Sequence, residues 1–134
     1  MSQLDKKRIA VFDFKAADCT QIAWAVRQCF SEAGVCAQVA EFTVARAFAA
    51  DFKGNADAGT PYDMTFISLD NMMGVETARN IRELDTGQPI FIVSESGEFG
   101  LEGFRLRALD YLIKPVSGSR IKEAVRRIGM RCQA

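Results

Sequence analysis

Histidine is absent from the 134 residues of this chain. Without an imidazole, the chain cannot build a Ser-His-Asp or Cys-His catalytic site, a zinc site with histidine ligands, or a histidine phosphocarrier. Long hydrophobic runs are absent too, because no run approaches the roughly 20 apolar residues that a membrane helix needs. The first residues, MSQLDKKRIAVFDF, lack the pattern of a secretory signal peptide. We therefore expect a cytoplasmic protein that does not engage a membrane.

The chain also has no excess of charge and no cysteine motif. Its 17 basic and 17 acidic residues cancel, which argues against non-specific binding to nucleic acid and against a polybasic membrane anchor. No two cysteines have Cys-x-x-Cys spacing, so we expect reduced thiols; the four are Cys19, Cys29, Cys36 and Cys132. A chain of this length is long enough to bury a substantial core, and we expect residues 1–134 to form a single domain.

Short apolar segments alternate with segments of helical periodicity along the chain. The apolar segments are typical of buried strands and lie at 9–14, 35–42, 62–69, 89–93 and 109–113. A helix is expected after each of them, at 18–34, from Thr43, at 74–87, at 97–107, and from Ser117 to about 131. Asp18, Thr43 and Ser117 are expected to be the N-caps of the first, second and last of these helices. This alternation predicts an α/β fold of the flavodoxin-like kind. It is a doubly wound, five-stranded parallel sheet of order 2-1-3-4-5 with helices on both faces.

Polar side chains end four of the five expected strands. They are Asp13, Ser68, Asp70, Ser94 and Lys114. Because ligands of such sheets bind beyond the carboxyl ends of the strands, these side chains should meet at one edge of the sheet. A carboxylate can hold Mg²⁺, and a lysine can hold an anionic phosphoryl oxygen. The pattern therefore indicates a site for anion and metal chemistry.

The second half of the chain resembles a known family. The segments GVETARNIREL and PIFIVSESGEFGLEGFRLRALDYLIKPVS are similar to receiver domains of bacterial two-component response regulators, the CheY-like superfamily. Within them, ALDYLIKPVS looks most like receivers that precede LytTR-type DNA-binding domains. The resemblance implies that Ser94 and Lys114 contact a phosphoryl group. It also implies a cis bond before Pro115, and a change of rotamer at Tyr111 on activation.

Two departures from the family pattern bear on phosphorylation. Receivers usually carry two adjacent acids after the first strand to hold Mg²⁺, whereas here Asp13 is followed by Phe14, whose ring is expected to fill the metal's space. Their phosphoacceptor is an aspartate that ends the third strand. One alignment puts Ser68 at that position, and the other puts Asp70 there with a shorter loop to the next helix. We favour Ser68, and we expect Mg²⁺ binding through Asp13 and Asp70 to be weak.

These observations predict a receiver-like signalling domain with a degenerate phosphorylation pocket and no enzymatic activity. Its expected partners are a sensor histidine kinase or another signalling protein, or a second copy that docks through helix four, strand five and helix five. DNA would be reached only through an effector domain, for which the chain leaves no room after its last helix. Two alternatives stay open. One is a conventional Mg²⁺-dependent receiver phosphorylated on Asp70, and the other is a flavodoxin-like enzyme or carrier.

Overall fold

The computed structural model describes residues 6–133 and the side chains of residues 6–128. Its strands are β1 (Lys7–Phe12), β2 (Ala37–Phe42), β3 (Met64–Ser68), β4 (Ile90–Ser94) and β5 (Asp110–Ile113). Its helices are α1 (Ala16–Glu32), α2 (Ala45–Asp57), α3 (Met72–Leu84), α4 (Gly100–Arg105) and α5 (Gly118–Gln133), with a 3-10 turn η2 (Gly97–Phe99) before α4. All strand pairs are parallel, in the order β2-β1-β3-β4-β5. The predicted fold class is confirmed.

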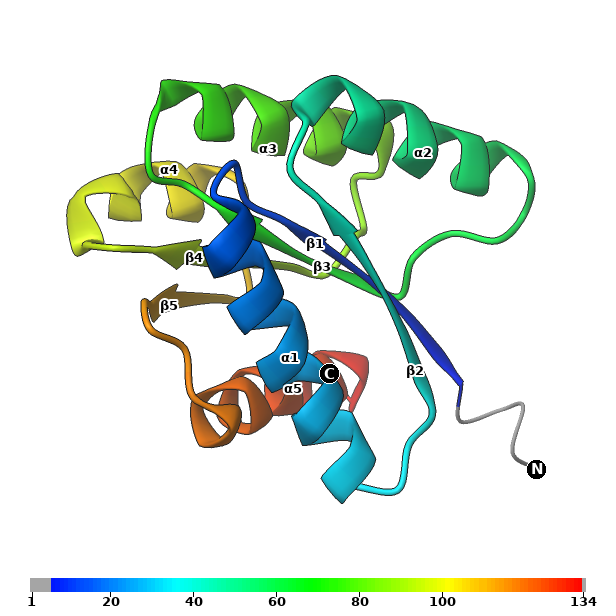
Figure 1. Ribbon diagram of the computed structural model, residues 1–134. Coiled ribbons are helices and arrows are strands. Elements are labelled where there is room, and N and C mark those ends of the chain that lie inside the picture. The colour runs from blue at the N-terminus through cyan, green and yellow to red at the C-terminus, as the bar shows by residue number, and fades with distance from the viewer. Residues whose placement is uncertain (1–5, 134) are drawn as a thin grey trace.

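Two apolar layers cover the sheet, one on each face. Figure 1 shows α1 and α5 on one face and α2 and α3 on the other. Successive residues of a strand point to opposite faces, so Ile9 and Val11 pack with α1 and α5, while Ala10 and Phe12 pack with α2 and α3. The central strands are buried on both sides, which explains their continuous apolar runs.

The register of the strands brings their carboxyl ends to one level. Phe12 pairs with Ile67, so Asp13 emerges beside the end of β3. Ser68 pairs with Val93, and Ser94 pairs with Ile113, so the next residue, Lys114, emerges beside the end of β4. Residues that are far apart in the sequence therefore meet at one edge of the sheet.

Several predicted boundaries shift by a few residues. The second strand begins at Ala37 rather than at residue 35, the fourth helix ends at Arg105, and the last helix continues to Gln133. Ser117 does cap the last helix, because it precedes Gly118 and its Oγ accepts a hydrogen bond from the Arg120 amide at 3.2 Å. These differences lie at element ends, where the hydrophobic pattern carries little information.

Two predicted helix caps are wrong. The first helix begins at Ala16, with Lys15 at its N-cap, so Asp18 lies inside the first turn and does not cap it. The second helix begins after Val44, and Thr43 lies outside it. Only three residues separate β1 from α1 and two separate β2 from α2, and neither helix has a side-chain cap.

Gly74 lies in the first turn of α3, where the helix passes over the end of β3. Asn71 caps this helix, because its Oδ1 accepts a hydrogen bond from the Gly74 amide at 2.9 Å. A Cβ atom on Gly74 would lie 2.6 Å from the backbone oxygen of Ser68. Only glycine allows α3 to approach the strand end this closely.

We expect Gly74→Ala to destabilise the fold by about 3 kcal/mol, since the added methyl group would push backbone against backbone. The matched control is Gly54→Ala, in exposed α2, where an added Cβ meets nothing within 4 Å. That change should stabilise the helix by about 0.5–1 kcal/mol. Urea unfolding of both variants measures the difference, and a Gly74→Ala variant as stable as wild type would contradict this description of the α3 start.

The described part of the chain contains no paired cysteine and no membrane-spanning helix. Cys19, Cys29 and Cys36 carry free thiols, while the side chain of Cys132 lies outside the described residues. Burial raises the pKa of the Cys19 thiol to about 11, so this group is an unreactive part of the core. No helix within residues 6–133 is both long enough and apolar enough to cross a bilayer.

Candidate functional site

A lysine lies at the centre of three carboxylates at the carboxyl edge of the sheet. The Nζ of Lys114 is 2.7 Å from an oxygen of Asp13, 3.0 Å from Asp18 and 2.5 Å from Asp70. We call these four residues the rim cluster. The Lys114 side chain is only 9% exposed, so its charge is neutralised by the acids rather than by solvent.

Asp70 holds its place through both carboxylate oxygens. One oxygen contacts Lys114, and the other accepts hydrogen bonds from the Ser94 hydroxyl at 3.1 Å and from the Glu95 amide at 2.9 Å. The Ser94 Oγ also lies 3.1 Å from the carbonyl oxygen of Leu69. The structure thus brings Asp70, Ser94 and Lys114 into direct contact.

Ser68 occupies a different position, beneath the rim cluster. It is the last residue of β3 and is buried, and its hydroxyl donates a hydrogen bond of 2.5 Å to Asp13. Asp13 is itself buried, and its second oxygen accepts a hydrogen bond from the Lys15 amide at 2.9 Å. Ser68 therefore supports Asp13 from below, while Asp70 reaches over it to the lysine.

Asp18 belongs to the site, although sequence reasoning interpreted it as a helix cap. It projects from the first turn of α1, and its carboxylate contacts Lys114. The signal that could have identified it is its position, because an acid in the first turn after β1 must lie at the carboxyl edge of the sheet. Asp18 thus supplies a third carboxylate.

Phe14 does not fill the rim cluster. Its ring packs into the apolar layer beneath α2 and α3, edge-on to Phe12 at a centroid distance of 4.8 Å. The expectation that this ring fills the space of a metal is therefore wrong. The substitution removes one carboxylate from the edge of the sheet and adds apolar contact area to the core.

Tyr111 points inward toward the start of α4. Its hydroxyl donates to the carbonyl oxygen of Ser96 at 2.7 Å and accepts from the Phe99 amide at 3.2 Å. A Cβ atom on Gly103 would lie 3.2 Å from the ring, so glycine makes room for the tyrosine. Tyr111 thus connects β5 with the segment that follows β4.

A small cavity opens beside Lys114. Its volume is about 220 Å³, and it is lined by Asp18, Gln21, Ile22, Glu95, Lys114 and Pro115. The Lys114–Pro115 peptide bond is cis. An exposed ion pair between Lys15 and Glu95 links the loop after β1 to the loop after β4. The cavity is large enough for a phosphoryl-sized group but not for a nucleotide.

Burial and charge act in opposite directions on the rim cluster. Burial alone would raise the pKa of Asp70, but hydrogen bonds from Lys114 and from the Glu95 amide outweigh it and hold the pKa below its usual value. Burial alone would lower the pKa of Lys114, whereas the carboxylates of Asp13, Asp70 and Asp18 raise it well above its usual value. The carboxylate of Asp70 and the ammonium of Lys114 are therefore both charged at neutral pH.

The three carboxylates are donors of the kind that Mg²⁺ prefers. One oxygen from each of Asp13, Asp18 and Asp70 lies within 4.8 Å of the others. The same oxygens now hold the ammonium of Lys114. The residues fit a divalent cation in chemical type, but the cation and the lysine compete for the same negative charge.

Comparison with known proteins gives one family. The family model described as "Response regulator receiver domain" matches residues 16–126. The Sensory transduction protein LytR of Staphylococcus epidermidis is 28% identical over 71 residues, which cover 52% of this chain and 28% of that protein. The Transcriptional regulatory protein LytR of Staphylococcus aureus strain N315 is 29% identical over 70 residues, covering 50% of this chain and 28% of that protein. Each match thus covers little more than a quarter of the relative.

Solved structures agree on the fold. The receiver (REC) domain of AraT, a response regulator from Geobacillus stearothermophilus, superposes with a TM-score of 0.74 at 18% identity, covering 95% of each chain. At this identity the likeness concerns the path of the backbone.

Proposed function

Because the chain belongs to the response regulator receiver domain family, we propose that it is a two-component receiver with a degenerate phosphorylation pocket. It would transmit a signal through contacts with other proteins, and aspartyl phosphorylation would be impaired. Its own residues would stabilise the edge of the sheet through the rim cluster.

The observation that carries this proposal is the position of Lys114. Its ammonium contacts all three carboxylates that would otherwise hold Mg²⁺. When bound, Mg²⁺ would offset the negative charge on the transferring phosphoryl oxygens. With Phe14 in place of an acid, and with the remaining acids paired to lysine, the affinity for the cation should be low. Ser68 is a poor substitute for a carboxylate nucleophile, because its hydroxyl is neutral and buried and its hydrogen bond holds Asp13.

A second function is favoured by the contacts of Asp70. Its carboxylate touches Ser94 and Lys114, the two residues to which the resemblance assigns phosphoryl contacts. Asp70 would then be the phosphoacceptor, although it lies two residues beyond the end of β3. Asp13 and Asp18 would hold the cation, and Lys114 would move from the carboxylates to the phosphoryl oxygens.

Phosphorylation with a small donor separates the two functions. After incubation with Mg²⁺ and acetyl phosphate, we expect the intact mass of the chain to stay unchanged. A receiver with the usual pair of acids, assayed in parallel, shows that the donor is active. Stoichiometric addition of about 80 Da, the mass of one phosphoryl group, would contradict the degenerate pocket.

Two controls identify the residue if mass is added. Asp70→Asn should abolish the addition if Asp70 is the acceptor, and hydroxylamine should remove it, because an acyl phosphate is labile to this nucleophile. Ser68→Ala removes the alternative acceptor, and a serine phosphate would survive hydroxylamine. Circular dichroism of both variants shows whether they remain folded.

The output surface is proposed to include α4, β5 and α5. Leu101, Phe104 and Ile113 expose large apolar side chains there, and Tyr111 connects β5 to the start of α4. Some charges on this surface are paired within the chain. Asp110 contacts Arg120 at 2.8 Å and Arg127 at 3.0 Å. We propose an effector domain as the partner of this surface. The homodimer expected here from the sequence is the alternative, and it stays untested.

The partners that we propose for the chain in signalling are inferred from the names of its relatives. One relative is named as a sensory transduction protein and another as a transcriptional regulatory protein. By analogy, a sensor histidine kinase would act upstream, and DNA would be reached through an effector domain. A cytoplasmic location also stays a proposal, supported by the free thiols of Cys19, Cys29 and Cys36.

A further inference from the structure

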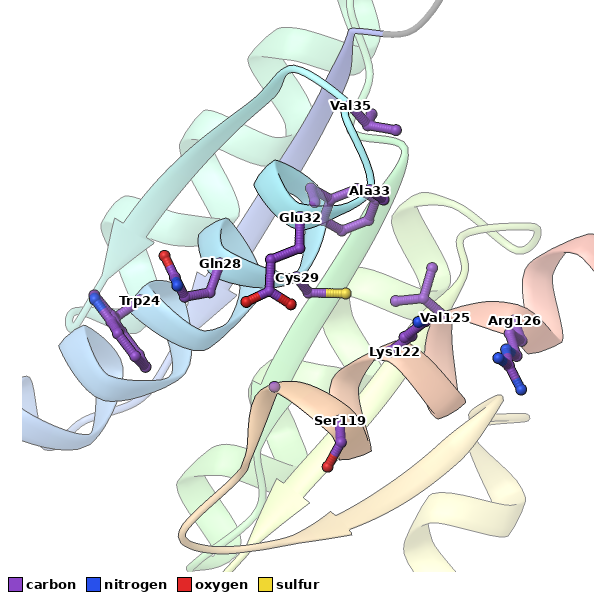
Figure 2. Close-up of a pocket in the computed structure, with 12 residues that line it drawn as sticks. Trp24, Gln28, Cys29, Glu32, Ala33, Val35, Ser119, Lys122, Val125 and Arg126 are labelled. Carbon is purple, nitrogen blue, oxygen red and sulfur yellow. The ribbon is translucent and has the colours of Figure 1, made fainter.

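A groove between α1 and α5 lies on the face of the molecule away from α2 and α3. Its volume is about 570 Å³. Figure 2 shows side chains of α1 facing those of α5 across it, with the sulfur of Cys29 directed toward α5. The floor is apolar and includes Cys29, Phe30 and Val125. None of the four residues of the rim cluster lines this groove.

The wall formed by α1 carries an exposed aromatic side chain. Trp24 is the single tryptophan of the chain, and its side chain is 59% exposed. Gln28 and Glu32 follow at intervals of four residues, so the three side chains form one stripe along the helix. Contact between this much of the indole ring and water is unfavourable, so burial of Trp24 against a partner would stabilise a complex.

The wall formed by α5 offers open space for an aromatic ring and basic side chains that could pair with an acid. Gly118 and Ser119 leave room at its start, since a Cβ atom on Gly118 would meet nothing within 4 Å. Lys122 and Arg126 follow on the same side of the helix. Among the side chains described, Glu32, Lys122 and Arg126 have no ion-pair partner. The groove therefore has unpaired charges of both signs along an apolar floor.

The residues on the two walls of the groove correspond in position along the helix axes. The Nε2 of Gln21 donates a hydrogen bond of 2.8 Å to the carbonyl oxygen of Val116, which fixes α1 relative to the start of α5. Counting three residues onward from Gln21 and from Val116 puts Trp24 near the level of Ser119. Because both helices rise by about 1.5 Å per residue, Glu32 lies close to the level of Arg126.

We propose that this groove binds a second copy of the chain, with a two-fold axis running along the groove. Such an axis places each α1 over the partner's α5. Trp24 then enters the open space beside Gly118 and Ser119 of the partner subunit. Glu32 meets the partner's Arg126, and the partner's Lys122 lies one helical turn before it, so one acid lies near two bases in each half of the interface.

The size of the surface predicts a weak dimer. Helix α1 has 17 residues and is therefore about 25 Å long. A face of two such helices buries a total of about 1,000 Å² between two copies, at the lower limit of specific interfaces. The dimer should therefore form at high protein concentration and dissociate on dilution.

The single tryptophan reports on the interface directly. Sedimentation velocity at high concentration should show a species of twice the 14.8 kDa chain mass. On dilution, the fluorescence of Trp24 should shift to longer wavelength in parallel with the loss of this species, because its ring returns to water. A chain that stays monomeric at every concentration would overturn the proposal.

Variants distinguish this groove from the surface of α4, β5 and α5. Trp24→Glu should abolish the dimer, and it keeps a good helix former at an exposed position, so the fold should survive. The matched control is Phe104→Glu, which changes an aromatic side chain that is 81% exposed on α4. This variant should dimerise like wild type. A dimer that survives Trp24→Glu, or one that Phe104→Glu also abolishes, would overturn the proposal.

Charge reversal tests the pairing across the interface. Glu32→Lys should weaken the dimer at least tenfold, because a third base would then face the partner's Lys122 and Arg126. Adding Lys122→Glu and Arg126→Glu to the same chain restores opposite charges and should restore dimerisation. If the triple variant stays as weak as Glu32→Lys, the proposed pairing is wrong.

Discussion

Replacing Lys114 by methionine should destabilise the fold by about 3–5 kcal/mol at neutral pH. The change removes the one ammonium that contacts Asp13, Asp18 and Asp70, and leaves three carboxylates close together with no counter-charge. Asp13 cannot turn to solvent, because it is buried and held by Ser68. Chemical denaturation at pH 7 measures the loss of free energy.

The matched control is Lys15→Met. Lys15 also pairs with an acid, Glu95, but the side chains of both residues are 56% exposed. An exposed ion pair of this kind contributes little, so the variant should stay within about 0.5 kcal/mol of wild type. Equal losses in the two variants would contradict the central role of Lys114.

The two proteins should respond to acid in opposite ways. In wild type, the pKa of Asp70 lies below its unfolded value of about 3.9. Its contribution to stability is therefore fully present above that pH, and is lost only as the pH falls through the lower folded value. Lys114→Met removes the group that lowers the pKa of Asp70 and leaves that carboxylate beside two others, so acidification from pH 7 to about 5 should stabilise the variant. Mg²⁺ should likewise raise its melting temperature more than that of wild type.

Replacing Arg82 by methionine should cost a similar amount, about 3–5 kcal/mol, far from the rim cluster. Arg82 is buried in α3, and its guanidinium donates hydrogen bonds to the carbonyl oxygens of Asp85, Thr86, Gln88, Leu106 and Arg107. These carbonyls belong to the loops that enter β4 and β5. The variant would leave several buried acceptors without a donor.

Arg79→Met is the control on the same helix. Arg79 lies one turn before Arg82, its side chain is 50% exposed, and it contacts Glu102 at 3.0 Å. This change should alter the free energy of unfolding by less than about 0.5 kcal/mol. Thermal unfolding of the two variants measures the contrast. If Arg82→Met has the same melting temperature as wild type, the guanidinium does not stabilise the loops before β4 and β5, and this account of Arg82 is wrong.

The fold could be predicted because its signals are local and repeated. The runs around Phe12, Phe66 and Phe91 are apolar on both faces, as buried parallel strands require. The meeting of Asp13, Ser94 and Lys114 followed from the fold alone, since parallel strands end at one edge of the sheet.

The details of the site could not be predicted, because they depend on how loops and helix starts are placed. Asp18 is an ordinary cap by sequence, and becomes a partner of Lys114 only because α1 begins at Ala16. The ring of Phe14 could have pointed to either side, and the packing of Phe12 draws it into the core. Asp70 and Ser68 share one face of an extended segment, and only the short turn into α3 separates their roles.

The most direct test is a crystal structure of the chain grown with Mg²⁺ and beryllofluoride, which mimics a phosphoryl group on a carboxylate. Our account predicts that Lys114 stays within hydrogen-bond distance of Asp13, Asp18 and Asp70, with no beryllofluoride on Asp70. Density for Mg²⁺ among these carboxylates, together with beryllofluoride on Asp70 in contact with Ser94 and Lys114, would contradict it.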